Sequence, residues 1–304
     1  MQEGYQDRAR SMKRQRYAEW CMRAFLSLCA WASIAITVAI ALVLAYESIH
    51  FFAHISIAEF LWTREWAPLF EPSRFGIWPL ISGTLLIVAI AGCIAMPMGL
   101  AAAIFLSEYV PDTMRRFFKP LVEVLAGIPS IVYGYFALTF VTPLLQRVIP
   151  DMDIFNALSA GMVMGVMILP LVCSLSEDAM LAVPRTLRMA AYALGATRFE
   201  TVSRVIVPAA LSGIVSAFIL GLSRAIGETM VVAIAAGSSP ILTFDPRRSI
   251  QTMTAYIAQV SLGETPQGTT VFQTLFAVAL LLFLMTLAMN IVSNVIVKRW
   301  RNKY

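Results

Sequence analysis

Six long apolar runs constrain this chain more than any other feature of its sequence. With 59% hydrophobic and only 13% charged residues, the chain has too little polar surface for a soluble fold. A helix needs about 20 apolar residues to cross a bilayer. Runs of that length lie at residues 24–46, 75–107, 124–146, 154–176, 205–242 and 265–297. The sequence therefore predicts an all-α, polytopic membrane protein with six transmembrane helices.

The lysines and arginines set the expected orientation of these helices, because basic residues favour the cytoplasmic side of a membrane. Most of them fall in four stretches, at residues 1–23, 115–119, 185–204 and 298–304. Both termini are therefore expected in the cytoplasm. Two termini on the same side require an even number of membrane crossings. The long run at residues 75–107 is therefore expected to cross the membrane once, with a bend near Pro97.

Two longer loops are expected on the opposite side. The first, at residues 47–74, is rich in tryptophan and phenylalanine, which belong at the membrane interface. His50 and His54 lie one helical turn apart there, but no further ligands accompany them, so no metal site is expected. The second loop, at residues 238–273, carries charges at residues 245–248 that we expect to solvate it.

Arg224 and Glu228 stand inside the fifth apolar run, where lipid would be expected. A charge at bilayer depth costs on the order of 3 kcal/mol, so it normally faces a pathway or a partner. At this spacing the two side chains would share one helix face. We expect Arg224 to attract an oxyanion with its planar fork of donors. The negative charge of Glu228 would keep the anion from being trapped at Arg224, and Thr229 would line the same pathway. The alternative is a structural ion pair that makes insertion tolerable.

An interruption is predicted in the third run. Pro129 removes a backbone hydrogen bond, and Gly127 allows the chain to bend. Such breaks are tolerated only where protein or a water-filled cavity covers the freed groups. Gly127, Pro129 and Ser130 therefore form either a pathway-lining kink or a packed kink without solute contact. In the fourth run, the spacing of Gly161 and Gly165 favours close helix packing.

A polar segment before the fifth run predicts two helices joined by a tight turn. The first extends from Pro184 to a left-handed cap at Gly195. Its apolar residues at helical spacing are Leu187, Ala190, Ala191 and Leu194. Thr197 and Glu200 form a Thr-x-x-Glu capping box for the second helix, which runs towards Pro208. An ordinary solvated loop between spans is the alternative.

The polar hairpin resembles the EAA loop of ABC importer permeases, which usually reads Glu-Ala-Ala, three residues, Gly, nine residues and Ile-x-Leu-Pro. Here Ala190-Ala191 precede Gly195 and Val205-x-Val207-Pro208, while Met189 stands in place of the acidic residue. In that family the loop docks in a groove of the ATPase subunit. The resemblance implies this coupling role for Met189, Ala190, Ala191, Leu194, Gly195, Thr197 and Pro208.

Three further blocks are similar to the PstC-type permeases of phosphate ABC importers. They are Phe-Leu-Ser-Glu-Tyr at residues 105–109, Gly-Ile-Pro-Ser-Ile-Val-Tyr-Gly at residues 127–134, and Arg-Ala-Ile-Gly-Glu-Thr-Met at residues 224–230. The likeness extends over residues 75–300 and implies a type I ABC importer permease fold in the bacterial inner membrane, with phosphate as the transported solute.

The same resemblance implies partners and a division of the chain. The partners would be a PstA-like second permease, two PstB-like ATPase subunits and a PstS-like external phosphate-binding protein. ATP and Mg²⁺ would bind to the ATPase, and no cofactor would bind to this chain. The expected parts are a basic tail at residues 1–23, a first helix with its external loop at 24–76, a permease domain at 77–297 with its coupling hairpin at 177–208, and a cytoplasmic tail at 298–304.

Single observations argue against two other functions, ATP hydrolysis and nucleic-acid binding. No lysine of this chain follows the glycine that a P-loop requires, so ATP hydrolysis by that motif is not expected here. The net charge of +5 follows from the membrane topology and gives no support to nucleic-acid binding. The remaining alternatives are a permease for sulfate or molybdate, a gradient-driven secondary transporter, and a membrane scaffold without transport.

Overall fold

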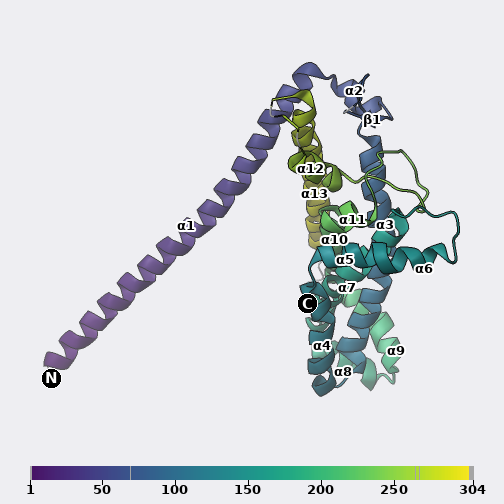
Figure 1. Ribbon diagram of the computed structural model, residues 1–304. Coiled ribbons are helices and arrows are strands. Elements are labelled where there is room, and N and C mark those ends of the chain that lie inside the picture. The colour runs from purple at the N-terminus through teal and green to yellow at the C-terminus, as the bar shows by residue number, and fades with distance from the viewer. Residues whose placement is uncertain (1, 69, 264, 267, 301–304) are drawn as a thin grey trace.

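The computed structural model describes residues 2–68, 70–263, 265–266 and 268–300, and these are almost entirely helical (Figure 1). Five of the described helices are long and apolar enough to cross a membrane, and a bent helix pair supplies a sixth span. The predicted membrane fold is thus confirmed. The end of the predicted C-terminal tail, residues 301–304, lies outside the described residues.

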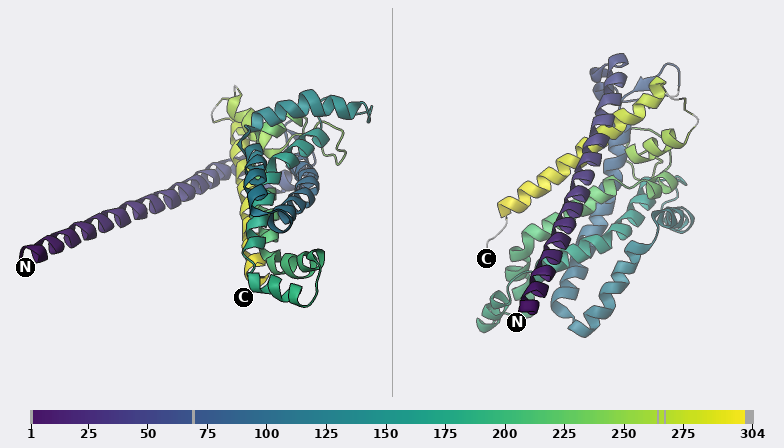
Figure 2. Two further views of the ribbon diagram at one scale, coloured as in Figure 1. Left: turned by 90° about the horizontal axis from the view of Figure 1, so that it is seen from below. Right: turned by 90° about the vertical axis from the view of Figure 1, so that its left-hand side faces the viewer.

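Three helices form the centre of the bundle. α3 (Trp78–Ile104), α7 (Ala157–Leu181) and α10 (Val207–Ile226) pack against one another, and α13 (Thr270–Trp300) packs on α10 (Figures 1 and 2). Apolar side chains of these helices are fully buried between them, among them Ile87, Ala91, Met164, Ile168 and Ala225.

Gly161 and Gly165 allow α7 to approach α3 closely. A Cβ atom added at Gly161 would lie 2.7 Å from Cβ of Ile90, and one at Gly165 would lie 3.0 Å from the carbonyl oxygen of Ala91. Both distances are shorter than an ordinary van der Waals contact, so a larger residue would push the two helices apart. The close packing expected from this glycine spacing is confirmed.

Replacing Gly161 by leucine is therefore expected to separate α7 from α3. Overpacking a tight core costs about 1–3 kcal/mol, and the loss should lower the melting temperature of the purified protein. The control is Val166→Leu, which adds bulk to an exposed position of the same helix. Equal melting temperatures for the two variants would contradict the close contact.

Neither Pro97 nor Pro208 breaks a membrane span. α3 continues through Pro97, and a π-helical turn, η1 (Phe105–Tyr109), extends it, so the bend expected there does not break the helix. A second such turn, η3 (Val202–Ile206), joins the short α9 (Arg198–Thr201) to α10. Pro208 lies in the first turn of α10, directly after the π-helical turn η3. The helix continues through this point, so the second helix of the hairpin and the fifth span are one continuous helix.

The first helix, α1 (Gln2–His54), leaves the bundle. Figures 1 and 2 show that it meets α13 near its own C-terminal end and diverges from there towards the N-terminus. Its apolar window has no buried residue within this chain. The expected boundary after residue 23 falls inside this helix, so the basic tail and the first span share one secondary structure element.

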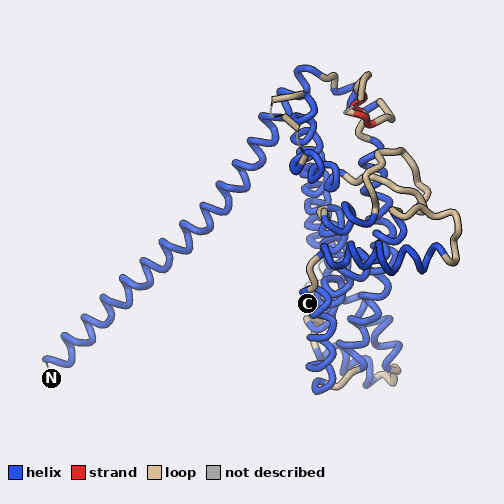
Figure 3. Tube along the Cα trace, viewed as in Figure 1, coloured by secondary structure: helices blue, strands red, loops and turns tan. Residues whose placement is uncertain are grey.

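At the end opposite the hairpin, the chain forms a small aromatic core. α2 (Ile57–Trp62) and a two-stranded antiparallel sheet, β1 (Trp66–Ala67) and β2 (Arg74–Phe75), lie there (Figure 3). They pack with α12 (Met253–Leu262), a helix within the stretch 238–273 that was expected to be loop. The buried aromatic residues are Phe51, Phe60, Trp66, Phe75 and Tyr256. Aromatic residues expected at the membrane interface are thus partly core, because their rings meet edge to face.

The charges of the second outer loop fix that loop instead of only solvating it. Arg248 lies 3.2 Å from a carboxylate oxygen of Asp151 and 3.5 Å from one of Asp153. Arg247 pairs with Asp245 at 2.8 Å, and hydrogen bonds from its side chain and backbone N–H lower the pKa of Asp245 to about 2. Because Asp153 lies shortly before α7, which begins at Ala157, these contacts attach the loop to the start of that helix.

Candidate functional site

Two interrupted helices meet inside the bundle. α4 (Asp112–Gly127) is followed by α5 (Ser130–Phe136), and the helical segment Ser130–Gln146 that begins with α5 is bent by 84° from α4. A second break separates α10 from α11 (Met230–Ala235). α5 lies directly against α11, since a Cβ atom added at Gly134 would lie 3.2 Å from the carbonyl oxygen of Met230 (Figure 1). The two breaks are thereby held on neighbouring elements.

The first break confirms the interruption predicted at Gly127, Pro129 and Ser130. Pro129 adopts an extended conformation and precedes the first turn of α5, which η2 (Ala137–Val141) and α6 (Thr142–Gln146) continue. The Tyr133 hydroxyl donates a hydrogen bond of 2.7 Å to the carbonyl oxygen of Leu125, near the C-terminal end of α4. A freed backbone acceptor is therefore satisfied by a side chain, as an apolar environment requires. No atom would lie within 4 Å of a Cβ at Gly127, so this end of α4 borders open space.

The second break lies at residues 227–229. The Glu228 N–H donates to the carbonyl oxygen of Ala225 at 3.2 Å, which closes the last turn of α10. One carboxylate oxygen of Glu228 accepts a hydrogen bond of 3.2 Å from the Met230 N–H, so the side chain folds back on the start of α11. Thr229 is half-buried, and its hydroxyl lies 3.5 Å from the carbonyl oxygen of Gly227.

Arg224 occupies the last turn of α10, and its side chain is exposed in this single chain. The expectation that Arg224 and Glu228 share a helix face is wrong, because regular helix ends at Ile226 and Glu228 lies in the break between α10 and α11. Among the ion pairs of the described residues, none joins Arg224 to Glu228 or to another carboxylate. The alternative of a structural ion pair therefore has no support within this chain.

This arrangement suits the binding of an oxyanion. A guanidinium offers several N–H donors in a planar fork that matches the oxygens of phosphate or carboxylate. Arg224 is exposed in this chain, lies beside a break in the helix, and has no carboxylate partner among the described residues. The Glu228 carboxylate accepts a backbone hydrogen bond, which restricts the freedom of its side chain.

The polar hairpin has the predicted form of helix, tight turn, helix. α8 (Arg185–Ala193) ends in a Schellman motif: the Ala196 N–H donates to Ala191 at 3.1 Å and the Gly195 N–H donates to Tyr192 at 3.0 Å. Gly195 has a φ of +81°, the left-handed conformation that favours glycine. The capping box of Thr197 and Glu200 is present at the start of α9. The hairpin is therefore a defined structure and the loop alternative is wrong.

The hairpin lies at one end of the bundle (Figure 1), and several of its apolar residues are exposed. Met189, Leu194 and Phe199 have 69%, 89% and 70% of their surface exposed. Beside them lies a groove of about 520 Å³ between the two helices, lined by Leu187, Ala190, Ala191, Leu194, Gly195, Ala196, Glu200, Arg204 and Val205. Exposed apolar patches of this kind mark protein interaction sites. Ala191 is buried, so it contributes to the packing of the hairpin more than to its surface.

An ion pair anchors the hairpin to the bundle. A guanidinium nitrogen of Arg188 lies 2.9 Å from a carboxylate oxygen of Glu108 in η1. Other Arg188 donors reach the carbonyl oxygens of Val183 at 2.7 Å and Met180 at 2.8 Å, at the end of α7. One side chain thus ties α8 to two spans. This pairing is not apparent from the sequence, because Glu108 and Arg188 lie 80 residues apart.

Replacing Arg188 by methionine should weaken this attachment. Removing one partner of a buried pair costs about 3–5 kcal/mol, because the remaining charge stays buried. We expect a lower melting temperature and less ATPase recovered with the purified chain. Arg185→Met is the matched control, since Arg185 is exposed on the same helix and makes no ion pair among the described residues. If both variants behave alike, the anchoring role of Arg188 is excluded.

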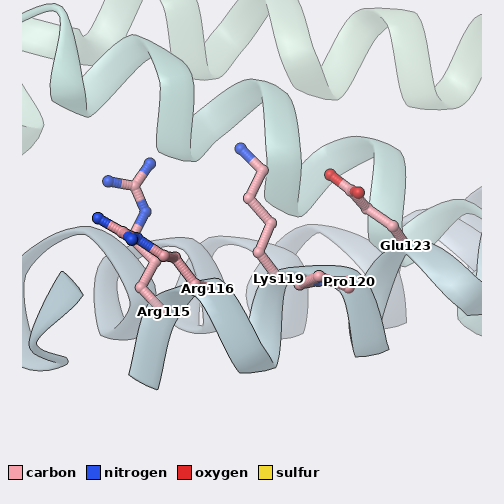
Figure 4. Close-up of a pocket in the computed structure, with 5 residues that line it drawn as sticks. All are labelled: Arg115, Arg116, Lys119, Pro120 and Glu123. Atoms are coloured by element: carbon pink, nitrogen blue, oxygen red, sulfur yellow. The ribbon is translucent and has the colours of Figure 1, made fainter. Parts of the chain in front are cut away.

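A second ion cluster lies where α4 crosses α7. The carboxylate of Glu177 in α7 is fully buried, and Arg115 and Lys119 of α4 approach it, Lys119 at 3.1 Å. Figure 4 shows Arg115 and Lys119 extending from α4 towards the neighbouring helix. The pocket beside them has a volume of about 470 Å³ and is lined by Arg115, Arg116, Lys119, Pro120 and Glu123. These contacts fix the half-helix that leads to the first break.

Comparisons with known proteins show the family to which this chain belongs. Residues 95–302 match the family model of the binding-protein-dependent transport system inner membrane component. The chain belongs to this family of ABC transporter permeases.

Individual relatives give the comparison more detail. The chain is 35% identical over 266 residues to the probable ABC transporter permease protein YqgH of Bacillus subtilis, covering 87% of this chain and 86% of that protein. It is 33% identical over 311 residues to the phosphate transport system permease protein PstC of Haemophilus influenzae, covering 95% and 93%. To PstC of Pasteurella multocida it is 33% identical over 266 residues, covering 80% and 81%.

Solved structures share the fold at lower identity. The chain superposes on a bacterial alginate ABC transporter with a TM-score of 0.61 at 16% identity, covering 90% of this chain and 95% of the other. On the MetNI methionine ABC transporter the TM-score is 0.57 at 21% identity, covering 74% and 98%. These likenesses place the chain in the fold of ABC importer permeases, and it is a multi-pass membrane protein.

Proposed function

We propose that this chain is a transmembrane subunit of an ATP-driven importer of inorganic phosphate in the bacterial cytoplasmic membrane. Its membership of the permease family and its similarity to PstC proteins support the reaction class and the solute. The observation that carries the proposal is the exposed guanidinium of Arg224 beside a break in α10. A fixed cation with free donors is suited to an oxyanion that passes between subunits.

Energy for transport would come from a separate ATPase that binds the hairpin. The apolar residues Met189, Leu194 and Phe199 would contact that subunit, together with the groove between α8 and α9. The hairpin is well suited to transmit motion, because residues 198–226 form one uninterrupted helix that ends beyond Arg224. Arg188 would carry the same motion into η1 through Glu108.

The remaining proposed partners are those implied by the similarity to PstC proteins. A second permease, similar to PstA, would close the pathway opposite Arg224. Two ATPase subunits similar to PstB would sit at the hairpins, on the cytoplasmic side. A phosphate-binding protein similar to PstS would deliver the solute at the end that carries α2 and α12.

The proposal is tested by reconstituting the purified complex in liposomes and measuring uptake of radiolabelled phosphate. Uptake should require ATP and the external binding protein, and excess unlabelled phosphate should abolish it, whereas sulfate and molybdate should not. Equal competition by sulfate or molybdate would assign the transporter to another oxyanion. Uptake that follows an ion gradient without ATP would instead indicate a secondary transporter.

A further inference from the structure

The backbone at the second break is held by a residue far from it in sequence. The hydroxyl of Thr254, in the first turn of α12, donates a hydrogen bond of 2.7 Å to the carbonyl oxygen of Glu228. That carbonyl lies between α10 and α11, where helix bonds are interrupted. We infer that Thr254 is a positioning residue of the solute pathway, which fixes the Glu228 backbone and so the direction in which α11 leaves Arg224. This inference rests on the proposed transport function.

The direction of each hydrogen bond follows from the chemistry of the groups. A carbonyl oxygen only accepts, so Thr254 must donate its proton to Glu228. The Thr254 oxygen then accepts from the hydroxyl of Thr252, which lies 3.1 Å away. The Thr252 oxygen in turn accepts from the Ala255 N–H at 3.2 Å. Each hydroxyl therefore donates once and accepts once, and such chains strengthen one another.

α12 itself is firmly placed, so it can serve as a fixed support. The Met253 N–H donates to the hydroxyl of Thr84 in α3 at 3.1 Å, and Tyr256 and Thr274 of α13 share a hydrogen bond of 2.6 Å. Thr252 and Thr254 are 2% and 5% exposed. The support is thus attached to two membrane helices, in a region that excludes water from the hydroxyl chain.

The position of this support explains why it should matter for transport. A carbonyl freed by a helix break must find a donor in an apolar environment. Without Thr254, α10 could extend through residues 227–229 or the break could shift, and either change would move Glu228 and Thr229 relative to Arg224. The loop that precedes α12 also contacts α11, because the Ile250 N–H donates a hydrogen bond to the carbonyl oxygen of Ala236 at the end of α11.

The test compares Thr254→Val, which keeps the shape but removes the hydroxyl, with Thr254→Ser, which keeps the hydroxyl. Uptake per purified complex is measured in liposomes over a range of concentrations of the solute-loaded binding protein. Loss of one buried hydrogen bond should reduce the maximal rate about tenfold in the valine variant, while the serine variant should retain most of it. Thr286→Val is the matched control, because its hydroxyl bonds only to carbonyls of its own helix.

Uptake by the Thr254→Val complex at the rate of the unaltered complex would overturn the inference. So would a serine variant as slow as the valine variant, because the hydroxyl would then not be the cause. If the valine variant yields no complex, Thr252→Val decides: it should slow uptake, and a normal rate would contradict the hydroxyl chain. Any oxyanion that the unaltered complex imports can serve as the solute, so a wrong assignment of phosphate would appear separately.

Discussion

Arg224→Gln is expected to reduce phosphate uptake by about 10- to 100-fold while the complex still assembles. The charged guanidinium would be replaced by a neutral amide, and hydrogen bonds between charged groups contribute about 1.5–3 kcal/mol each. Since Arg224 has no carboxylate partner among the described residues, the substitution leaves no buried charge behind. Radiolabelled uptake per complex measures the effect, and co-purification of the ATPase measures assembly.

Two further variants separate the role of Arg224 from that of charge in general. Arg224→Lys keeps the charge but loses the planar fork, so its uptake should lie between that of the unaltered complex and that of Arg224→Gln. Arg64→Gln removes an exposed arginine from the outer loop and should leave uptake unchanged. Full uptake by Arg224→Gln, with normal assembly, would show that the arginine does not contact the solute.

Gly195→Glu is expected to uncouple ATP hydrolysis from transport. Gly195 lies at the tip of the hairpin with a φ of +81°, and a side-chain residue in this conformation costs about 1–2 kcal/mol. No atom would lie within 4 Å of its Cβ, so the new carboxylate would project from the surface proposed to contact the ATPase. We expect transport to fall about tenfold while ATP hydrolysis continues, and the external binding protein should still bind its solute.

A second glycine of the chain offers a matched control for Gly195→Glu. Gly268 has a φ of +84°, also borders open space, and lies in the loop before α13, at the opposite end of the molecule from the hairpin. Gly268→Glu introduces the same strain and charge there and should leave the ratio of ATP hydrolysed to phosphate transported unchanged. Undiminished transport by Gly195→Glu would contradict the docking role of the hairpin.

The sequence predicted those features whose cause is local. Apolar runs located the spans, Pro129 located the first break, and the turn at Gly195 followed from the glycine and from the capping box of Thr197. In each case the determining groups lie within a few residues of the feature, so their spacing along the chain is informative.

Features that depend on distant contacts were missed or wrong. Residues 224–228 lie inside a long apolar run that predicts continuous helix, yet the helix ends at Ile226. At the break, the Glu228 carbonyl accepts a hydrogen bond from Thr254 of α12, and the Glu228 carboxylate accepts one from the Met230 N–H. Likewise, nothing near Arg188 indicates that Glu108 is its partner. The fold of ABC permeases could be predicted from sequence, while the relation between Arg224 and Glu228 required the structure.

The unbroken helix of residues 198–226 has a mechanical consequence. At 1.5 Å per residue it is roughly 44 Å long, so a rigid-body tilt of about 10° at the hairpin would displace its far end by about 8 Å. A shift of that size exceeds the length of an ion pair. If the proposed ATPase rotates the hairpin by this amount, Arg224 would move from one side of the solute to the other without local unfolding of the helix.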